Sequence, residues 1–454
     1  MKKTLCLLLC LAMLTGLASV AVAESTDSTY VNTGKLQYDA TKEVNNGQPM
    51  TIEFWVQSEL SNIYQKWCDA YTALHPNITF NITLASHDDH FTKLGMALPA
   101  GTGPDMFHMH NAYADQLIPN MKPYDFNVMP LDILREDFSL TDENLYDGKL
   151  YYMGVGIMTG GIFYNKTLWA QAGLTDADFP KTWDDLAAVA KKLTQVDATG
   201  KMQVAGFNYN EMMMDTLINA MDYQKGQAMF ERDSKIPVFN QNFIDTVQWL
   251  KNLYDVDKVC TTEMPMSIVS FSQSTTAMVY CWGWYSNWLT QNAPDLDYGF
   301  FPSPSWDGET PAVYDRLNME VSPAINANVS DEKYAVINDF LCYFLSNDNA
   351  NLDFSLSLST APARKCLAQN EKVVNDPVLS VTMAKADRLL YPGAFPEAYM
   401  TSILNNCYAG VMLNGVSVED AMNLCREEIT DAMDSTDFVS LESRYAHADE
   451  LSFE

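Results

Sequence analysis

The chain has 454 residues and a formal net charge of −30, from 58 acidic and 28 basic side chains. Nucleic acid and anionic membrane surfaces are poor partners for such a protein, because like charges repel. A neutral or cationic ligand is easier to accommodate. The length is too great for one ordinary hydrophobic core and favours two lobes.

The start of the chain has the pattern of an export signal. Lys2 and Lys3 precede an apolar run over residues 5–14, and Ala-Val-Ala stands just before Glu24. This order predicts a cleaved signal peptide over residues 1–23 and a periplasmic or extracellular protein. Both cysteines of this region lie inside the apolar run, so there is no clear lipobox. No later apolar run reaches the roughly 18 residues needed to cross a bilayer, so we expect no membrane-spanning segment.

The first folded segment has a strand–helix–strand pattern. Residues 50–56 alternate between apolar and polar side chains, residues 64–74 carry apolar side chains at helical spacing, and residues 78–84 alternate again. Such a unit is typical of α/β proteins. Ligands of α/β sheets bind beyond the carboxyl ends of the strands, so Gln57 and Glu59 are expected at the edge of a cleft.

Residues 151–164 are rich in glycine, β-branched and aromatic side chains. This composition predicts two buried strands that meet at Gly160-Gly161, where the backbone has the flexibility of a hinge. A short helix should follow and end at Gly173. Thr182 is then placed as the N-cap of the next helix, with Asp185 as its capping-box partner.

Four short motifs of this region carry a resemblance to a known family. They are Gly148-Lys149-Leu150-Tyr151, Tyr164-Asn165-Lys166, Ala172-Gly173-Leu174 and Pro180-Lys181-Thr182-Trp183. In this order and spacing they resemble the extracellular solute-binding proteins of ABC importers, in the sugar-type, maltose-binding-like branch. The resemblance runs from about Met50 to Met433, and the acidic tail after Asp434 matches nothing. It implies a two-lobe periplasmic-binding-protein fold of the α/β class, with a hinge and a ligand cleft between the lobes.

The resemblance also implies how the chain is divided. Residues 24–49, polar and poor in large apolar side chains, are interpreted as a flexible leader. We expect one lobe from residues 50–156 plus 316–372 and the other from residues 157–315 plus 373–454. Strand crossovers that would form the hinge are expected near residues 156–161, 304–316 and 370–376.

Several ligand contacts follow from matching positions in the family. The first-lobe contact falls near His110 and Asn111. In maltose-type relatives the loop after the strand that matches residues 204–207 supplies an acid and an aromatic side chain, which makes Tyr209 and Glu211 candidates.

Aromatic side chains form a dense cluster near residue 284. Sugar recognition needs flat apolar faces for the ring and planar polar groups for the hydroxyls. By resemblance, Trp284 matches the aromatic that stacks on sugar, whereas Trp282 stands where the family more often has glycine. Tyr285 is a further candidate in this cluster, and Trp55 follows the same reasoning on the first strand.

Other kinds of function have weaker support. His108 and His110 share one face of a strand near His87 and His90, but only six histidines exist and no helical pair supports a metal cage. No GxSxG, HExxH or P-loop pattern is present, so we expect neither catalysis nor a cofactor. The seven cysteines after residue 23 include no CxxC motif.

The sequence therefore predicts a monomeric binding subunit that captures a carbohydrate, most simply an oligosaccharide, and delivers it to membrane permease subunits. Two alternatives stay open. The same scaffold could bind another solute, such as a polyamine or a phosphodiester, although the cleft segments carry almost no basic residues, which disfavours an anion. A secreted glycan-active enzyme would instead require a paired carboxylate.

Overall fold

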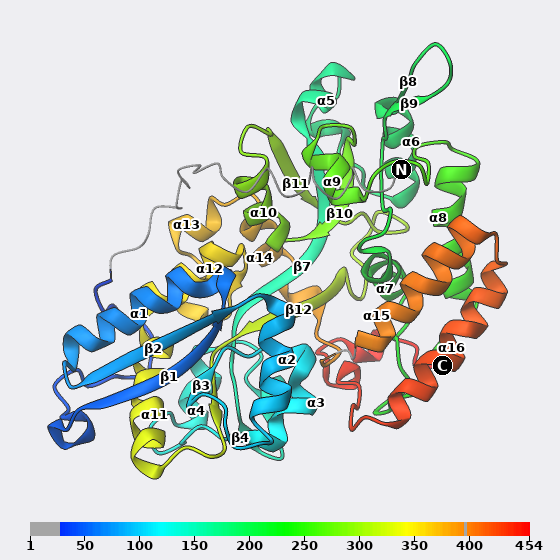
Figure 1. Ribbon diagram of the computed structural model, residues 1–454. Coiled ribbons are helices and arrows are strands. Elements are labelled where there is room, and N and C mark those ends of the chain that lie inside the picture. Colours follow the sequence, from blue (N-terminus) through cyan, green and yellow to red (C-terminus); the bar gives the residue numbers. More distant parts are fainter. Residues whose placement is uncertain (1–27, 395–396) are drawn as a thin grey trace, which may run out of the picture.

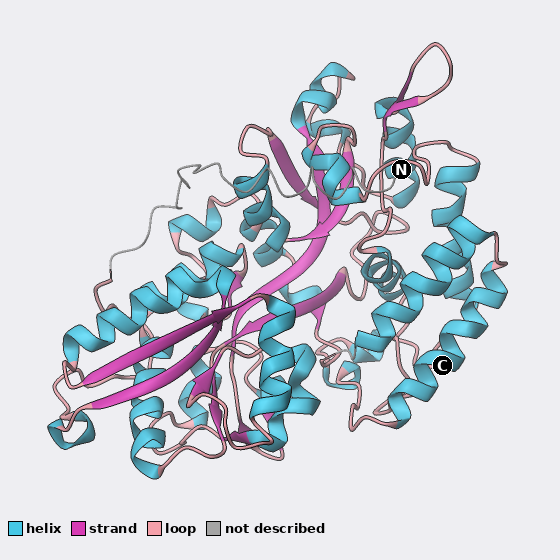
Figure 2. Ribbon diagram, in the orientation of Figure 1, coloured by secondary structure: helices cyan, strands magenta, loops and turns pink. Residues whose placement is uncertain are grey.

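The computed structural model describes residues 28–394 and 397–454 and contains two lobes joined by long strands (Figure 1). Strands form the centre of each lobe and helices pack around them (Figure 2). The predicted α/β class is therefore confirmed. The predicted signal peptide, residues 1–23, lies outside the described residues.

Lobe 1 is built on a five-stranded sheet with the order β2-β1-β3-β13-β4. The strands are β1 (Met50–Gln57), β2 (Ile78–Ala85), β3 (Met106–Phe107), β4 (Met121–Lys122) and β13 (Ala324–Asn326). β2 and β3 both run parallel to β1, as the strand–helix–strand pattern predicts, and β13 runs antiparallel to β3 and β4. The helices of this lobe are α1 (Ser61–Leu74), α2 (His87–Ala97), α3 (Ala114–Leu117), α4 (Leu131–Asp137), α11 (Asp331–Ser346) and α12 (Asp348–Leu358).

The second sheet joins the lobes through β7 (Gly154–Asn165), which is buried along its whole length. β7 pairs with β10 (Met278–Trp282), β11 (Tyr298–Pro302), β12 (Asp315–Val321) and β14 (Ala361–Pro362), and β12 also pairs with β15 (Leu389–Leu390). Ile157 belongs to the hydrophobic core of lobe 1, whereas Met158 belongs to that of lobe 2. The strand therefore passes from one core to the other within one residue.

Helices supply most of lobe 2. They are α5 (Lys166–Gln171), α6 (Trp183–Leu193), α7 (Met214–Gln224), α8 (Gln241–Asp255), α9 (Ser267–Ser272), α10 (Trp284–Asn292), α15 (Glu397–Ile403), a π-helix (Leu404–Leu413) and α16 (Val418–Asp434). Of the shorter elements, β5 (Leu145–Tyr146) and β6 (Lys149–Leu150) belong to lobe 1, where Leu150 is part of the core. The others are β8 (Gln195–Val196), β9 (Met202–Val204), α13 (Glu371–Val374) and α14 (Leu379–Ala384). The predicted capping box is present: Thr182 and Asp185 cap α6 reciprocally.

Gly160 and Gly161 do not separate two strands, so the prediction that two strands meet there is wrong. β7 runs through both residues without interruption. A Cβ atom at Gly160 would lie 2.1 Å from the Tyr280 hydroxyl, and one at Gly161 would lie 2.3 Å from the ring of Phe300. The glycines are needed because side chains of the neighbouring strands lie against the backbone of β7 at these positions.

Residues 28–49 do not form a free leader. Thr33 donates hydrogen bonds to Asp348 through its backbone N–H (2.7 Å) and its hydroxyl (2.6 Å), and the backbone N–H groups of residues 35 and 36 donate to Asp137 at 2.8 Å. Leu36 and Val44 are buried in the core of lobe 1. The prediction of a flexible leader is wrong for these residues, because buried carboxylates of lobe 1 bind the polar backbone.

The acidic tail is also part of the fold. The carboxylate of Glu442 is fully buried in lobe 2, where it accepts hydrogen bonds from the Tyr223 hydroxyl (2.6 Å) and from the backbone N–H groups of Met229 (2.7 Å) and Phe230 (3.0 Å). Phe438 packs in the same core. The tail therefore closes one side of lobe 2.

The seven cysteines of the described residues are free thiols, and all except Cys366 are buried. Cys407 of the π-helix lies close to Cys425 of α16. This contact and burial raise the pKa of the Cys407 thiol, so it remains protonated near neutral pH.

Candidate functional site

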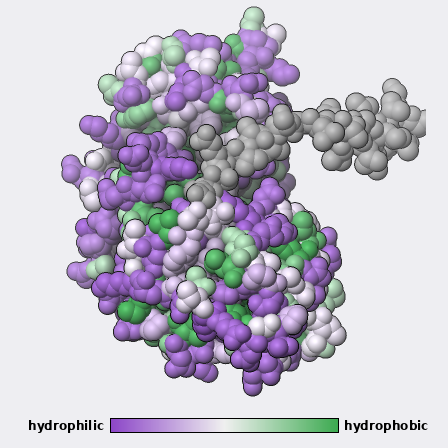
Figure 3. All heavy atoms as spheres, turned by 90° about the vertical axis from the view of Figure 1, so that its left-hand side faces the viewer, coloured by the Kyte–Doolittle hydropathy of each residue, from purple (hydrophilic) through white to green (hydrophobic). Residues whose placement is uncertain are grey.

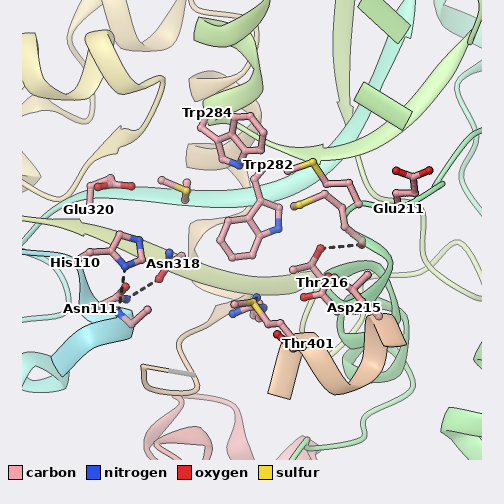
Figure 4. A pocket seen from close by; sticks show the side chains of 17 residues that line it. His110, Asn111, Glu211, Asp215, Thr216, Trp282, Trp284, Asn318, Glu320 and Thr401 are labelled. Carbon is pink, nitrogen blue, oxygen red and sulfur yellow. Dashed lines mark hydrogen bonds between the residues drawn. The ribbon is translucent and has the colours of Figure 1, made fainter. Parts of the chain in front are cut away.

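A cavity of about 560 Å³ lies between the lobes. Side chains of lobe 1, of the connecting strands and of lobe 2 all line it: His110, Asn111, Ala112, Met158, Glu211, Met212, Met213, Asp215, Thr216, Trp282, Trp284, Arg316, Asn318, Glu320, Met400, Thr401 and Leu404. In Figure 4, His110, Asn111 and Glu320 lie on one side, Glu211, Asp215 and Thr216 lie on the other, and Trp282 stands between them.

Strand β12 contributes three polar side chains to the cavity. Arg316, Asn318 and Glu320 line it, whereas the intervening residues 317 and 319 pack in the core of lobe 1. This alternation follows from the pleat of a strand, in which successive side chains point to opposite faces. The crossing strand thus places a guanidinium, an amide and a carboxyl in a row along the cavity.

His110 and Asn111 form the wall from lobe 1. The Asn111 amide donates to the side-chain oxygen of Asn318 at 2.6 Å, which ties this loop to β12. His110 Nδ1 accepts a hydrogen bond from the backbone N–H of Ala112 at 3.2 Å. Burial and the nearby His87 lower the pKa of His110 to about 4, so the ring is neutral near neutral pH. With Nδ1 accepting, the proton resides on Nε2, which can donate to a ligand.

Two tryptophans supply flat apolar surface. Trp282 ends β10 and is 5% exposed, with the guanidinium of Arg316 lying 4.7 Å from its ring centroid. Its indole N–H donates to the Tyr280 hydroxyl at 3.3 Å. Trp284 begins α10, is less buried, and meets the ring of Tyr285 at 73°. Trp284 therefore has the more accessible ring, and Trp282 is held in place by its neighbours.

Carboxyl groups outnumber the single guanidinium. Burial raises the pKa of Glu320 to about 7, and it also raises the pKa of Asp215, against the opposing effect of Arg316. Glu211 lines the same cavity and has a left-handed backbone with φ of 61°. An anionic ligand would face several acids and one partly compensated cation, so the cavity favours ligands that donate hydrogen bonds.

Glu320 makes the stability of the protein depend on pH. A carboxyl whose pKa is higher in the folded than in the unfolded state favours folding in acid, and this contribution is lost as the pH rises from about 4 to 7. We expect the unfolding temperature of Glu320→Gln to decline less than that of the unchanged protein between about pH 5 and pH 8. Thermal unfolding at several pH values measures this. The exposed Glu59→Gln is the control, and an unchanged slope for Glu320→Gln would contradict the assignment.

The remaining wall is apolar and adaptable. Met158, Met212, Met213 and Met400 all line the cavity. Methionine is unbranched and polarizable, so it can fit ligand surfaces of different shapes. Met213 has a left-handed backbone with φ of 65° directly before α7, which is a position where strain is often associated with binding.

Five of the ten predicted site residues line this cavity: His110, Asn111, Glu211, Trp282 and Trp284. The structure thus brings together candidates that are up to 174 positions apart (284 minus 110). Their roles in ligand binding stay predictions.

The prediction is wrong for Tyr209 and Tyr285, which are buried in lobe 2. Tyr209 is 1% exposed and its hydroxyl donates to the backbone carbonyl of Leu250 at 2.6 Å. Tyr285 has no exposed surface, and its hydroxyl donates to the carbonyl of Ile268. Both rings are buried, whereas Glu211 and Trp284 of the same two segments line the cavity.

Trp55, Gln57 and Glu59 do not line the cavity either. Trp55 packs at the border of the lobe 1 core. Gln57 is 8% exposed and its side-chain oxygen lies 3.2 Å from His87 Nδ1, while Glu59 is exposed to solvent. The Gln57 side chain thus contacts α2, and Trp55, Gln57 and Glu59 are all absent from the lining of this cavity.

Sequence reasoning misses the site residues of β12 and α7. The alternation of Arg316, Asn318 and Glu320 with apolar residues is visible in the sequence and could have indicated a strand with one polar face. Asp215 and Thr216 carry no comparable signal, because they enter the cavity only through the position of α7.

No group of three or more metal-binding side chains that could hold a metal ion occurs within residues 28–394 and 397–454. The clustered histidines have other partners. His90 Nε2 lies 2.8 Å from the carbonyl of His108. The Nδ1 atom of His108 lies 3.2 Å from the Tyr64 hydroxyl.

Among the described residues, every helix is too short or too polar to cross a membrane. One face of the molecule is mostly hydrophilic, with scattered apolar residues (Figure 3).

The fold and the site define a two-lobed binding protein. Strands connect the two lobes, and a polar, tryptophan-lined cavity lies between them. The chain belongs to the bacterial extracellular solute-binding protein family, whose model matches residues 66–380. The predicted family and two-lobe fold are thereby confirmed.

Individual relatives and solved structures are also similar to this chain. The arabinooligosaccharide-binding protein of Bacillus subtilis (strain 168) is 25% identical over 274 residues, which cover 56% of this chain and 60% of that protein. The maltose/maltodextrin-binding domain MalE from Bdellovibrio bacteriovorus bound to maltotriose superposes with a TM-score of 0.69 at 19% identity, over 85% of this chain and 100% of the other. UgpB from Mycobacterium tuberculosis in complex with glycerophosphocholine gives 0.70 at 16% identity, over 85% and 98%.

Proposed function

We propose that this protein captures a carbohydrate between its two lobes and delivers it to the permease subunits of an ABC importer. One observation carries the proposal: two indole rings and hydrogen-bonding groups from both lobes line one cavity. Aromatic faces pack on the C–H surface of a sugar ring, and amide, imidazole and carboxyl groups bind its hydroxyls. The arabinooligosaccharide- and maltotriose-binding relatives support this class of ligand.

Binding is coupled to closure of the lobes. Asn318 and Glu320 lie on the connecting strand, His110 lies on lobe 1, and Trp284 lies on lobe 2. A ligand that contacts all of them stabilises the closed arrangement more than the open one, because only the closed arrangement makes both sets of contacts. The permease then recognises the closed, loaded form.

The same proposal gives the lobes as residues 50–156 plus 316–372 and 157–315 plus 373–454, with residues 28–49 added to lobe 1. The hydrophobic cores support this division to within one residue at its first boundary, because the first core contains Leu36 and still includes Ile157, and the second contains Met158 and Met433. The protein acts as an exported monomer and performs no catalysis. The function of its family, solute binding, supports the last point.

A non-sugar solute is the second candidate, since UgpB, with the same fold, is seen with glycerophosphocholine. A choline group would suit the indole rings through cation–π attraction. Its phosphodiester, however, would lie among Glu211, Asp215 and Glu320 with Arg316 as the only cationic lining residue. The charge of the cavity therefore favours a neutral saccharide over a phosphodiester.

A thermal-shift screen of residues 24–454 tests the proposal. The panel contains mono- and oligosaccharides, polyols, polyamines and glycerophosphodiesters. A ligand at 100 times its Kd adds about 2.7 kcal/mol to the free energy of unfolding, which is easily detected. We expect a shift from a few saccharides. A shift from polyamines or phosphodiesters alone, with none from saccharides, would contradict the proposed ligand class.

A further inference from the structure

A second cavity adjoins the one between the tryptophans. It has a volume of about 480 Å³ and shares His110, Ala112 and Met400 with the first. The two cavities are therefore neighbouring chambers of one cleft, separated at His110 and Met400. We name them the tryptophan chamber and the outer chamber.

The wall of the outer chamber on lobe 1 is aromatic. Tyr113 lies flat on Phe91, with ring centroids 3.9 Å apart and planes 7° apart. Phe91 is 2% exposed, so it fixes the Tyr113 ring from behind. The ring of His87 lies 6.0 Å from Tyr113 and 5.7 Å from His110. Aromatic surface thus continues from His110 along the outer chamber.

The polar lining of the outer chamber is neutral or acidic and comes from both lobes. Asp88, Asp115 and Gln116 belong to lobe 1, and Thr436 follows α16 in lobe 2. Neither lysine nor arginine is among its lining residues. Partial desolvation and the nearby carboxylate of Asp437, an acid of lobe 2, both raise the pKa of Asp115. A ligand whose hydroxyl groups donate hydrogen bonds to these side chains therefore suits this surface better than an anionic ligand does.

We propose that the outer chamber is a second saccharide subsite, and that the ligand is a linear oligosaccharide whose chain passes His110 to reach Tyr113. This inference rests on the proposed carbohydrate function. One end of the chain lies against Trp282 and Trp284, and later rings lie on the platform of Tyr113 and His87. Since Thr436 lines the outer chamber from lobe 2, a long ligand also contacts both lobes there and gains from closure at two places.

Calorimetric titration with linear malto-, manno- and arabino-oligosaccharides of two to six residues tests the inference. In the series that binds, we expect affinity to rise at least about tenfold from the disaccharide to the tetrasaccharide, since an added ring gains aromatic contact and hydrogen bonds. Tyr113→Ala should abolish this rise and leave the affinity for the disaccharide unchanged. Thr436→Trp, which fills the chamber from the opposite lobe, should do the same.

Tyr334→Ala is the matched control, because Tyr334 is a similarly half-buried tyrosine of lobe 1 that lines neither chamber. Thermal unfolding confirms that each variant is folded. Equal affinity for all lengths, or equal weakening of short and long saccharides by Tyr113→Ala, would overturn the outer subsite and leave the carbohydrate function intact. Absence of binding in every series would instead contradict the proposed function itself.

Discussion

Trp284→Ala is expected to weaken saccharide binding by roughly 30- to 800-fold. The indole of Trp284 lines the tryptophan chamber and is only partly buried by the protein, so a ligand covers much of its remaining surface. Truncation removes about 2–4 kcal/mol, from lost apolar burial and from lost ring contact. The unfolding temperature should change little, because the ring is not part of a fully buried core.

Trp288→Ala provides the matched control for this variant. Trp288 lies one helical turn further along α10, is also partly buried, stacks on Tyr285 at 5.5 Å, and lines neither chamber. Calorimetric titration of both variants with the same saccharide separates the effect of the chamber from the effect of losing a tryptophan. Equal affinities for the two variants would show that Trp284 does not contact the ligand.

Arg364→Ala is expected to lower the free energy of unfolding of lobe 1 by about 3–5 kcal/mol, the usual cost of leaving a buried charge without its partner. Arg364 has no exposed surface. Its guanidinium donates to Asp348 at 2.7 Å, to Asp137 at 3.3 Å and to the side chain of Asn32 at 2.7 Å. Without it, two buried carboxylates lose their counter-charge and residues 28–43 lose an anchor.

Urea unfolding and limited proteolysis measure these two effects. The midpoint in urea should fall, and residues 28–43 should become accessible to protease. Lys365→Ala is the control at the next position. Lys365 is exposed and donates one hydrogen bond to the carbonyl of Arg135, so its loss should cost no more than about 0.5 kcal/mol. An Arg364→Ala midpoint as high as that of Lys365→Ala would contradict the structural role of the buried ion pairs.

Local signals in the sequence predict much of the fold. The alternation over residues 50–56, the helical spacing that follows, and the Thr182–Asp185 capping box all correspond to observed elements. These features depend on residues that are close together in the sequence, so the sequence alone predicts them. The role of Gly160-Gly161 is not visible in this way, because the close approach of Tyr280 and Phe300 depends on strands far away in the sequence.

The site is less accessible to sequence reasoning. Within the aromatic cluster, Trp282 and Trp284 line the cavity, whereas Tyr285 is buried. Residue type alone does not show whether a side chain faces the core or the cavity. Asp215 reaches the cavity only through the packing of α7 between the lobes. The structural role of the acidic tail is hidden for a similar reason, since three donors to the Glu442 carboxylate, Tyr223, Met229 and Phe230, lie more than 200 positions away.

A crystal structure of residues 24–454 with the saccharide that gives the largest thermal shift tests the central claim most directly. We expect the saccharide between the lobes, with a ring against Trp284, a hydroxyl within hydrogen-bonding distance of Asn318 or Glu320, and contacts to both lobes. A saccharide bound to the outer surface of one lobe, with the cavity between the lobes unoccupied, would contradict the proposed function.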